Sequence, residues 1–273
     1  TGVAEGQDRA VEAARRASFD SINVDLIYGL PHQSLTSFDT TLTRVSSARP
    51  DRIALYNYAH LPQLFKSQRR IREEDLPSPE TKLKLLGLAI GRLTAAGYVY
   101  IGMDHFALPE DALAVAQRQG RLHRNFQGYS VQADADLVGL GVSAIGAIGP
   151  TYSQNHRALE DYYDALDRGE LPVMRGIELT ADDLVRRAVI QALMGQFALS
   201  MESIAVSYLV DFNRYFAAEL EALHEFTDLG LVTVGDGWIT ITPKGRLLVR
   251  NICMVFDRYL RQASEARRHS RVI

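Results

Sequence analysis

Side chains that could bind or transform a ligand gather between residues 98 and 148. Apolar, strand-like runs in this stretch end in polar, glycine-rich segments, which is where sites lie when loops follow parallel strands. Aromatic residues are interleaved with the polar ones, which a plain surface loop would not require. The residues that predict a ligand site are Met103, Asp104, His105, Phe106, His123, Arg124, Asn125, Phe126, Gln127 and Tyr129.

The chemistry open to these residues is carboxylate binding and proton transfer. Arg124 suits a carboxylate, because a guanidinium can bind one through two parallel hydrogen bonds. His60, His105 and His123 could form a metal site, but none has a histidine four residues away or a cysteine nearby. We therefore expect no metal site. Histidine titrates near neutral pH, so either proton transfer or a structural hydrogen bond remains open for each of them.

Asp25 lies within an alternating apolar stretch, residues 21–31, that predicts a strand. Ile22, Val24, Leu26 and Tyr28 would share one face of it, and Asn23, Asp25 and Ile27 the other. A parallel strand that is covered on both faces should be apolar throughout, and a buried unpaired carboxylate is strongly destabilising. Asp25 therefore lies either in a lumen that holds a ligand or on the wet face of an edge strand.

A glycine motif, GLGVSA at residues 139–144, fits a variant of the dinucleotide-binding fingerprint. That fold also needs an acidic residue at the end of a second strand about 20 residues later. Glu160 and Asp161 lie instead in a helical pattern. A dinucleotide fold stays open, but we favour a second interpretation, in which Gly139 and Gly141 let the backbone approach a ligand at a barrel rim.

Strand and helix patterns alternate four times before residue 170, which predicts parallel βα units joined by right-handed crossovers. The pattern then changes to three helices, a hairpin around Gly235-Asp-Gly237 and a last helix, which is typical of a winged-helix-like module. We expect two domains, 1–175 and 176–273. The predicted strands are 21–31, 51–62, 98–103 and 136–148, and the predicted helices 37–45, 79–96, 110–119, 155–168, 180–195, 200–208 and 212–229.

The winged-helix-like module does not predict nucleic-acid binding. Between residues 211 and 228 the sequence has five acids and one base, Arg214, whereas phosphate contacts by basic side chains supply most non-specific affinity. The net charge of −3 gives no general attraction to nucleic acid or to an acidic membrane. No apolar run reaches about 20 residues, and Cys253 is the one cysteine. We expect a cytoplasmic monomer with no membrane partner.

Several motifs carry a resemblance to a known family: NVDLIYGLP (23–31), YNYAHLP (56–62), GMDHFA (102–107), HRNFQGY (123–129), GLGVSAI (139–145), RNICM (250–254) and SRVI (270–273). Together they closely resemble the oxygen-independent coproporphyrinogen III oxidases, radical S-adenosylmethionine enzymes of haem biosynthesis. The resemblance implies oxidative decarboxylation of two propionates of coproporphyrinogen III, giving protoporphyrinogen IX. It also implies a [4Fe–4S] cluster and an electron donor.

The resemblance assigns roles to particular residues. Contacts to S-adenosylmethionine would fall on Asp25, Ala59 and Ile145. We also expect His123, Arg124, Gln127 and Tyr129 to bind substrate, because basic, amide and aromatic groups suit a flat macrocycle with charged arms. The implied fold is an α/β one: a partial radical-SAM (βα) barrel followed by the helical module.

One departure from the family is large. The family holds its cluster on a C-x-x-x-C-x-x-C loop, and this chain has one cysteine where three thiolates are needed. The chain therefore resembles the C-terminal portion of the enzyme, and we expect it to be inactive alone. The alternative is a non-catalytic protein of the family that binds S-adenosylmethionine or haem.

Overall fold

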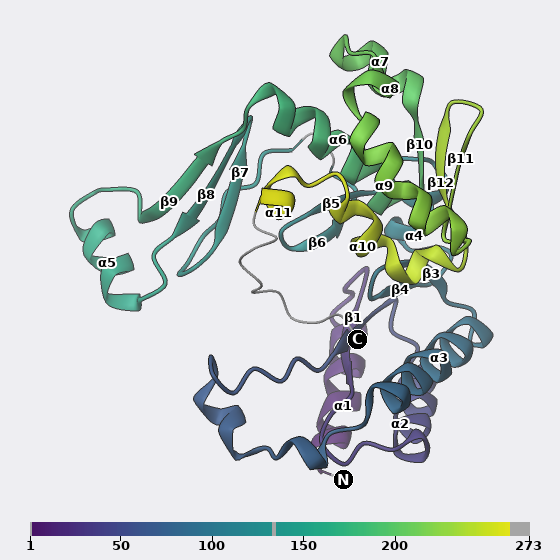
Figure 1. Cartoon of the computed structure of the whole chain (residues 1–273). Coiled ribbons are helices and arrows are strands. Elements are labelled where there is room, and N and C mark those ends of the chain that lie inside the picture. The colour runs from purple at the N-terminus through teal and green to yellow at the C-terminus, as the bar shows by residue number, and fades with distance from the viewer. Residues whose placement is uncertain (1, 133–134, 263–273) are drawn as a thin grey trace. The chain divides into compact units, whose positions relative to one another are not determined.

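The computed structural model of the chain describes residues 2–132 and 135–262. Within these ranges the chain forms two compact units, unit 1 up to Gln119 and unit 2 from Gly120 onward. Both units contain helices and strands (Figure 1). Across the described ranges, no helix is both long and apolar enough to cross a membrane.

Unit 1 is built on a four-stranded sheet of order β1-β2-β4-β3. Its strands are β1 (Asn23–Tyr28), β2 (Arg52–Asn57), β3 (Val99–Gly102) and β4 (His105–Ala107). β1 and β2 are parallel, whereas β4 is antiparallel to both β2 and β3. The chain reverses between β3 and β4 because Gly102 and Met103 both have positive φ, and the Tyr100 hydroxyl donates to the Met103 carbonyl at 2.7 Å.

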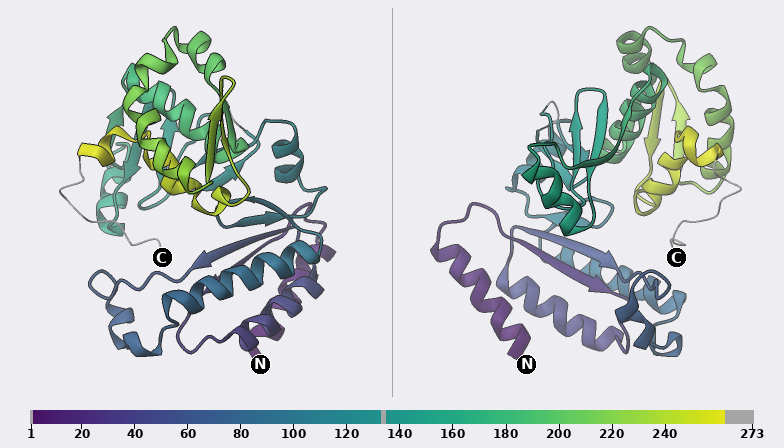
Figure 2. Two further views of the ribbon diagram at one scale, coloured as in Figure 1. Left: turned by 45° about the vertical axis from the view of Figure 1, so that its right-hand side comes forward. Right: turned by 90° about the vertical axis from the view of Figure 1, so that its left-hand side faces the viewer.

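Two long helices cover one face of this sheet. In Figure 2, α2 (Leu35–Ala48) and α3 (Pro79–Ala95) lie on the same side of the strands. Phe38 and Leu42 of α2 and Leu85 of α3 pack in the core with the apolar side chains of β1 and β2. The unit also contains α1 (Gly2–Arg16), α4 (Ala112–Arg118) and the 3₁₀ turns η1 (Lys66–Arg70) and η2 (Glu73–Asp75).

Unit 2 contains three small antiparallel sheets. They are the hairpin β5 (His123–Asn125) with β6 (Gly128–Ser130), the sheet of β7 (Ile145–Ile148), β8 (Thr151–Asn155) and β9 (Val173–Glu178), and the sheet of β10 (Ala198–Ser200), β12 (Trp238–Ile241) and β11 (Val232–Gly235). The short helix α5 (Leu159–Asp167) connects β8 to β9.

The helices of unit 2 pack around α6 (Ala181–Gln196), and Thr180 and Asp183 form a capping box at its start. The other helices are α7 (Met201–Tyr208), α8 (Phe212–Tyr215), α9 (Ala217–Asp228), η3 (Gly245–Leu248), α10 (Val249–Met254) and α11 (Arg258–Gln262).

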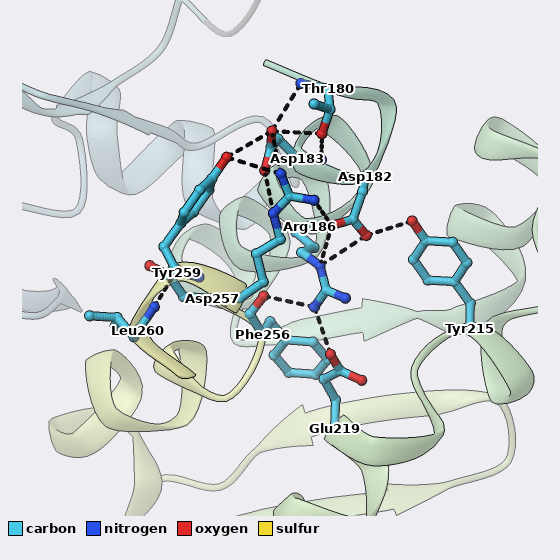
Figure 3. Close-up of polar contacts among 11 residues, drawn as sticks. Thr180, Asp182, Asp183, Arg186, Tyr215, Glu219, Phe256, Asp257, Tyr259 and Leu260 are labelled. Carbon is cyan, nitrogen blue, oxygen red and sulfur yellow. Dashed lines mark hydrogen bonds and ion pairs between the residues drawn. The ribbon is translucent and has the colours of Figure 1, made fainter. Parts of the chain in front are cut away.

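An ionic network joins α6 to the helices that follow it (Figure 3). Arg186 contacts Asp182 at 2.9 Å, Glu219 of α9 at 2.6 Å and the Phe256 carbonyl at 3.1 Å. Arg258 contacts Asp182 at 2.8 Å and Asp183 at 3.2 Å. Three carboxylates thus share two guanidinium groups, which fixes α6, α9 and α11 to one another.

The expectation of four successive parallel βα units is wrong. Among the described residues only β1 and β2 pair in parallel, and the stretch 136–148 contributes β7 to an antiparallel sheet. A tight turn at Gly149, with φ +51°, sends β8 straight back along β7, so no crossover helix follows.

Several predicted helix boundaries also change. The predicted helix 37–45 is longer, Leu35–Ala48, and Ser34 caps it, because its hydroxyl accepts the Ser37 N–H. The predicted helix 155–168 begins at Leu159, since Asn155 pairs within the β8–β9 ladder. The predicted helix 212–229 is two helices that break at Phe216. The predicted domain boundary near 175 stays a prediction.

Candidate functional site

The face of the unit 1 sheet opposite its helices is polar and partly open. Asp25 pairs with Ala54 and Ile27 with Tyr56, so these residues share that face, as period-two alternation requires. Asp25 is exposed, and its Oδ1 accepts a hydrogen bond from the Asn23 amide at 2.7 Å. Tyr56 is 39% exposed, so an aromatic ring and a carboxylate are both presented to a ligand.

The polar residues that follow β1 and β2 are held by local hydrogen bonds. Ala59 is exposed, and its carbonyl accepts from the Gln68 amide at 3.1 Å. The Tyr58 hydroxyl and His60 Nδ1 lie 3.5 Å apart. Burial, together with the nearby Asp104 carboxylate, raises the pKa of Tyr28 to about 12, so this phenol stays neutral.

In unit 2 the β5–β6 hairpin lies along α6. The Gln191 side chain bonds to both backbone groups of Arg124, accepting from its N–H at 3.2 Å and donating to its carbonyl at 2.6 Å. The Tyr129 hydroxyl donates to the Met194 carbonyl at 3.1 Å. The Leu122 carbonyl accepts from Gln196 at 3.0 Å. These contacts fix the hairpin in register against one face of the helix.

Ile145 lies on a sheet face that the hairpin reaches. Its ladder partner is Gln154, and Tyr152, two residues before Gln154, points to the same face. The Phe126 ring meets the Tyr152 ring edge-on with centroids 4.9 Å apart. The Arg187 guanidinium lies 6.0 Å from the Tyr152 ring centroid. Tyr152 therefore connects the hairpin tip to α6, on the sheet face that also carries Ile145.

The glycine motif has a structural explanation within unit 2. A Cβ on Gly139 would lie 2.9 Å from the Ile145 carbonyl carbon, so only glycine permits this approach. The buried Asn155 side chain donates to the carbonyls of Gly139 and Gly141 at 2.9 and 3.0 Å. A β-hairpin, β7–β8, follows the motif where a dinucleotide-binding fold would place a helix. The dinucleotide alternative is therefore wrong.

The two units divide the predicted site residues between them. Asp25 and Ala59 belong to unit 1, whereas Ile145 and the predicted substrate residues His123, Arg124, Gln127 and Tyr129 belong to unit 2. Within unit 2 the structure brings Arg124 and Tyr129 together across the hairpin, with the guanidinium 5.0 Å from the ring centroid. Gln127 is exposed at the hairpin tip, and the motif at 270–273 lies outside the described residues.

Sequence reasoning missed three residues that line this part of unit 2, namely Tyr152, Arg187 and Gln191. A signal for two of them was present. Arg187 and Gln191 are polar residues four positions apart in an otherwise apolar helical stretch, so they share one helix face. Tyr152 has no such signal, because its role depends on β-sheet register across the turn at Gly149.

Metal ligands are not gathered anywhere in the ranges 2–132 and 135–262, which hold no group of three or more histidine, cysteine or acidic residues suited to a metal ion. Cys253 is buried in α10. Burial raises the pKa of this thiol to about 12, so it stays protonated at neutral pH. A single cysteine that stays protonated does not suit a site that needs several thiolate ligands.

Comparison with known proteins shows what the chain is similar to. Residues 179–248 match the family model described as the HemN C-terminal domain. The oxygen-independent coproporphyrinogen III oxidase of Escherichia coli strain K12 is 52% identical over 260 residues, which are 95% of this chain and 57% of that protein. The protein of the same description from Thermostichus vulcanus is 47% identical over 94% of this chain and 79% of its own length.

A solved structure agrees with these relatives. It is that of coproporphyrinogen III oxidase (HemN) from Escherichia coli, described as a radical SAM enzyme, with a TM-score of 0.92 and 50% identity. The match covers 94% of this chain and 59% of that one. The chain thus spans little more than half the length of several of the proteins it matches.

Proposed function

Because the chain belongs to the family of oxygen-independent coproporphyrinogen III oxidases, we propose that it corresponds to the C-terminal portion of such an enzyme. The reaction would be the oxidative decarboxylation of two propionates of coproporphyrinogen III to vinyl groups, giving protoporphyrinogen IX. In fold terms, residues 1–175 would form part of a radical-SAM barrel, and residues 176–273 a winged-helix-like domain. We place the protein in the cytoplasm as a monomer, with neither nucleic acid nor membrane as a partner.

The observation that carries the proposal is the open polar face of the unit 1 sheet. Asp25 on the edge strand β1 and Tyr56 on the neighbouring strand β2 are both exposed on the face away from α2 and α3, where a ligand could reach them. Asp25 would hold S-adenosylmethionine through its carboxylate, which accepts hydrogen bonds from ammonium or ribose hydroxyl groups. Ala59 and Ile145 would pack against the cofactor, which supplies the radical chemistry of the family when it is bound.

The residues present fit this cofactor. Asn23 occupies one carboxylate oxygen of Asp25, and within the described residues no hydrogen bond is made to the other. Asp25 can therefore accept from a ligand without losing its present contact. On the substrate side, His123, Arg124, Gln127 and Tyr129 would bind a flat macrocycle with charged arms, since they combine cationic, amide and aromatic groups.

The residues present do not fit a [4Fe–4S] cluster. Three thiolates are needed to leave one iron open for S-adenosylmethionine, and the single cysteine is buried and protonated. The cluster and the docking of its electron donor would belong to another part of the enzyme. The chain alone should therefore be inactive.

The proposal is tested by S-adenosylmethionine binding to the chain, measured by isothermal titration calorimetry. Asp25→Asn keeps the shape but removes the charge, and we expect it to weaken binding at least about tenfold, the factor that corresponds to ~1.4 kcal/mol. Asp20→Asn is the matched control, because Asp20 is an exposed aspartate of the same unit. Equal affinity of both variants would remove Asp25 from the site.

A second candidate function is a non-catalytic protein of the family that binds S-adenosylmethionine or haem. The observation that favours it is the lack of thiolate ligands. Anaerobic reconstitution of the chain with iron and sulfide, followed by an assay for 5′-deoxyadenosine, should give no product from the chain alone. If a separately supplied cluster-bearing segment of the family restores turnover, the chain is part of an enzyme. If the chain binds S-adenosylmethionine but gives no turnover with that segment, the result supports the non-catalytic function.

A further inference from the structure

Three partly buried arginines of unit 2, Arg124, Arg187 and Arg246, form no ion pair with a described residue, and Arg246 lies over the Phe197 ring. Arg124 lies on β5 and Arg187 on α6. Arg186 and Arg258, by contrast, each contact two carboxylates. A partly desolvated guanidinium without a counter-charge is costly, so the difference needs an explanation.

Arg124 is held ready for a ligand. Gln191 bonds both of its backbone groups, and its guanidinium stacks over Tyr129, whose hydroxyl is anchored on Met194. Its Nη1 is buried and makes no hydrogen bond in the described structure. An unmade hydrogen bond of a buried charged donor is destabilising, whereas a bound anion would compensate the charge.

Arg187 lies near the hairpin tip on the side of α6. It precedes Gln191 by one turn, so its side chain leaves α6 on the face that holds the hairpin. Its Nη1 lies 3.5 Å from the Tyr152 hydroxyl, and the Tyr152 ring contacts Phe126 at the hairpin tip. Aromatic rings therefore border both guanidinium groups, and the contacts that orient them are backbone groups, rings and a phenol hydroxyl.

We infer that Arg124 and Arg187 form a carboxylate-binding subsite, in which Arg187 is a residue that sequence motifs did not indicate. The ligand class is a planar aromatic or macrocyclic molecule with carboxylate arms, since cationic groups border aromatic surfaces here. The inference rests on the proposed function, in which this arm is a propionate of the tetrapyrrole. The subsite anchors a propionate and takes no part in bond breaking.

The test is binding of coproporphyrin III, the air-stable oxidised form of the macrocycle, to the full chain, followed by its absorbance and fluorescence. Arg124→Gln and Arg187→Gln should each weaken binding at least about tenfold, or ~1.4 kcal/mol. Arg187→Lys should retain part of the affinity, because it keeps the charge but not the planar fork. Arg168→Gln is the control, since Arg168 pairs with Glu170 while 58% exposed.

A carboxylate-free probe, the tetra-amide of coproporphyrin III, separates charge recognition from ring stacking. It should bind the wild-type chain weakly and be indifferent to both Gln substitutions. Equal coproporphyrin affinity in wild type and in folded Gln variants would overturn the subsite and leave the proposed function standing. No coproporphyrin binding by the wild-type chain would overturn the subsite together with the substrate assignment of residues 123–129.

Discussion

The ionic network of Figure 3 gives a sharp stability prediction for unit 2. Arg186→Met keeps the length of the side chain and removes its charge. Asp182 would keep two partners, Arg258 at 2.8 Å and the Tyr215 hydroxyl at 2.6 Å, and its side chain is 25% exposed. The Glu219 side chain is only 3% exposed, and it would lose its 2.6 Å ion pair with Arg186.

The magnitude follows from that burial. Removing one partner of a buried ion pair typically costs ~3–5 kcal/mol, because the other charge stays desolvated. We expect a loss of this size in the free energy of unfolding of unit 2. Replacing both partners, in Arg186→Met with Glu219→Leu, should recover most of the loss, since well-packed apolar residues substitute for buried ion pairs at little cost.

Urea unfolding followed by tryptophan fluorescence measures this effect. Trp238 is the only tryptophan of the chain and lies on β12, so its signal reports on unit 2. Arg168→Met is the matched control, because its ion pair with Glu170 is exposed to solvent and should contribute little to stability. A loss below about 1 kcal/mol in Arg186→Met, or a double variant as unstable as the single one, would refute the reasoning.

Three further predictions concern pH, packing and partners. Burial acts to raise the pKa of Asp183, but hydrogen bonds from Thr180 and Tyr259 and the charge of Arg258 outweigh it, so the pKa is lowered. The ionised Asp183 therefore stabilises the fold above its pKa in the unfolded chain, about 3.9. This stability is lost as the pH falls through the pKa of Asp183 in the folded protein. Thermal melts should show that loss, and Asp183→Asn should reduce it. Gly195→Ala would put a Cβ 2.6 Å from the Leu122 carbonyl oxygen, so it should weaken coproporphyrin III binding by displacing the β5–β6 hairpin. Gly235→Ala, where a Cβ would meet nothing within 4 Å, should not. Duplex DNA should not bind at physiological salt, since α9 is acidic; a sub-micromolar, salt-dependent complex in an electrophoretic shift assay would contradict this.

Local patterns predicted the elements that depend on nearby residues. The alternation through Asp25 gave the two faces of β1 correctly, because a strand's side chains alternate whatever its neighbours are. The hairpin at Gly235–Gly237 was also confirmed. Each of these signals lies within a few residues, so tertiary packing had little scope to override it.

Strand direction could not be read in the same way. The prediction of repeated parallel units assumed that every gap between strands holds a crossover, whereas β3–β4 and β7–β8 reverse through tight turns. Met103 is in the left-handed region there, which its residue type does not indicate. The assignments of Asp25, Ala59 and Ile145 came from the family resemblance and stay predictions that the binding experiments address.

Arg186 and Arg187 show why adjacent, identical residues escape sequence reasoning. A helix turns by about 100° per residue, so two neighbouring side chains leave it in different directions. Arg186 meets Asp182 and Glu219 and holds helices together, whereas Arg187 meets the phenol ring of Tyr152. A cation whose counter-charge is in the fold stabilises the fold. Arg187 is partly buried beside an aromatic ring and has no carboxylate partner among the described residues, so its guanidinium can pair with an anionic ligand. For this reason we assign Arg187, rather than Arg186, to binding.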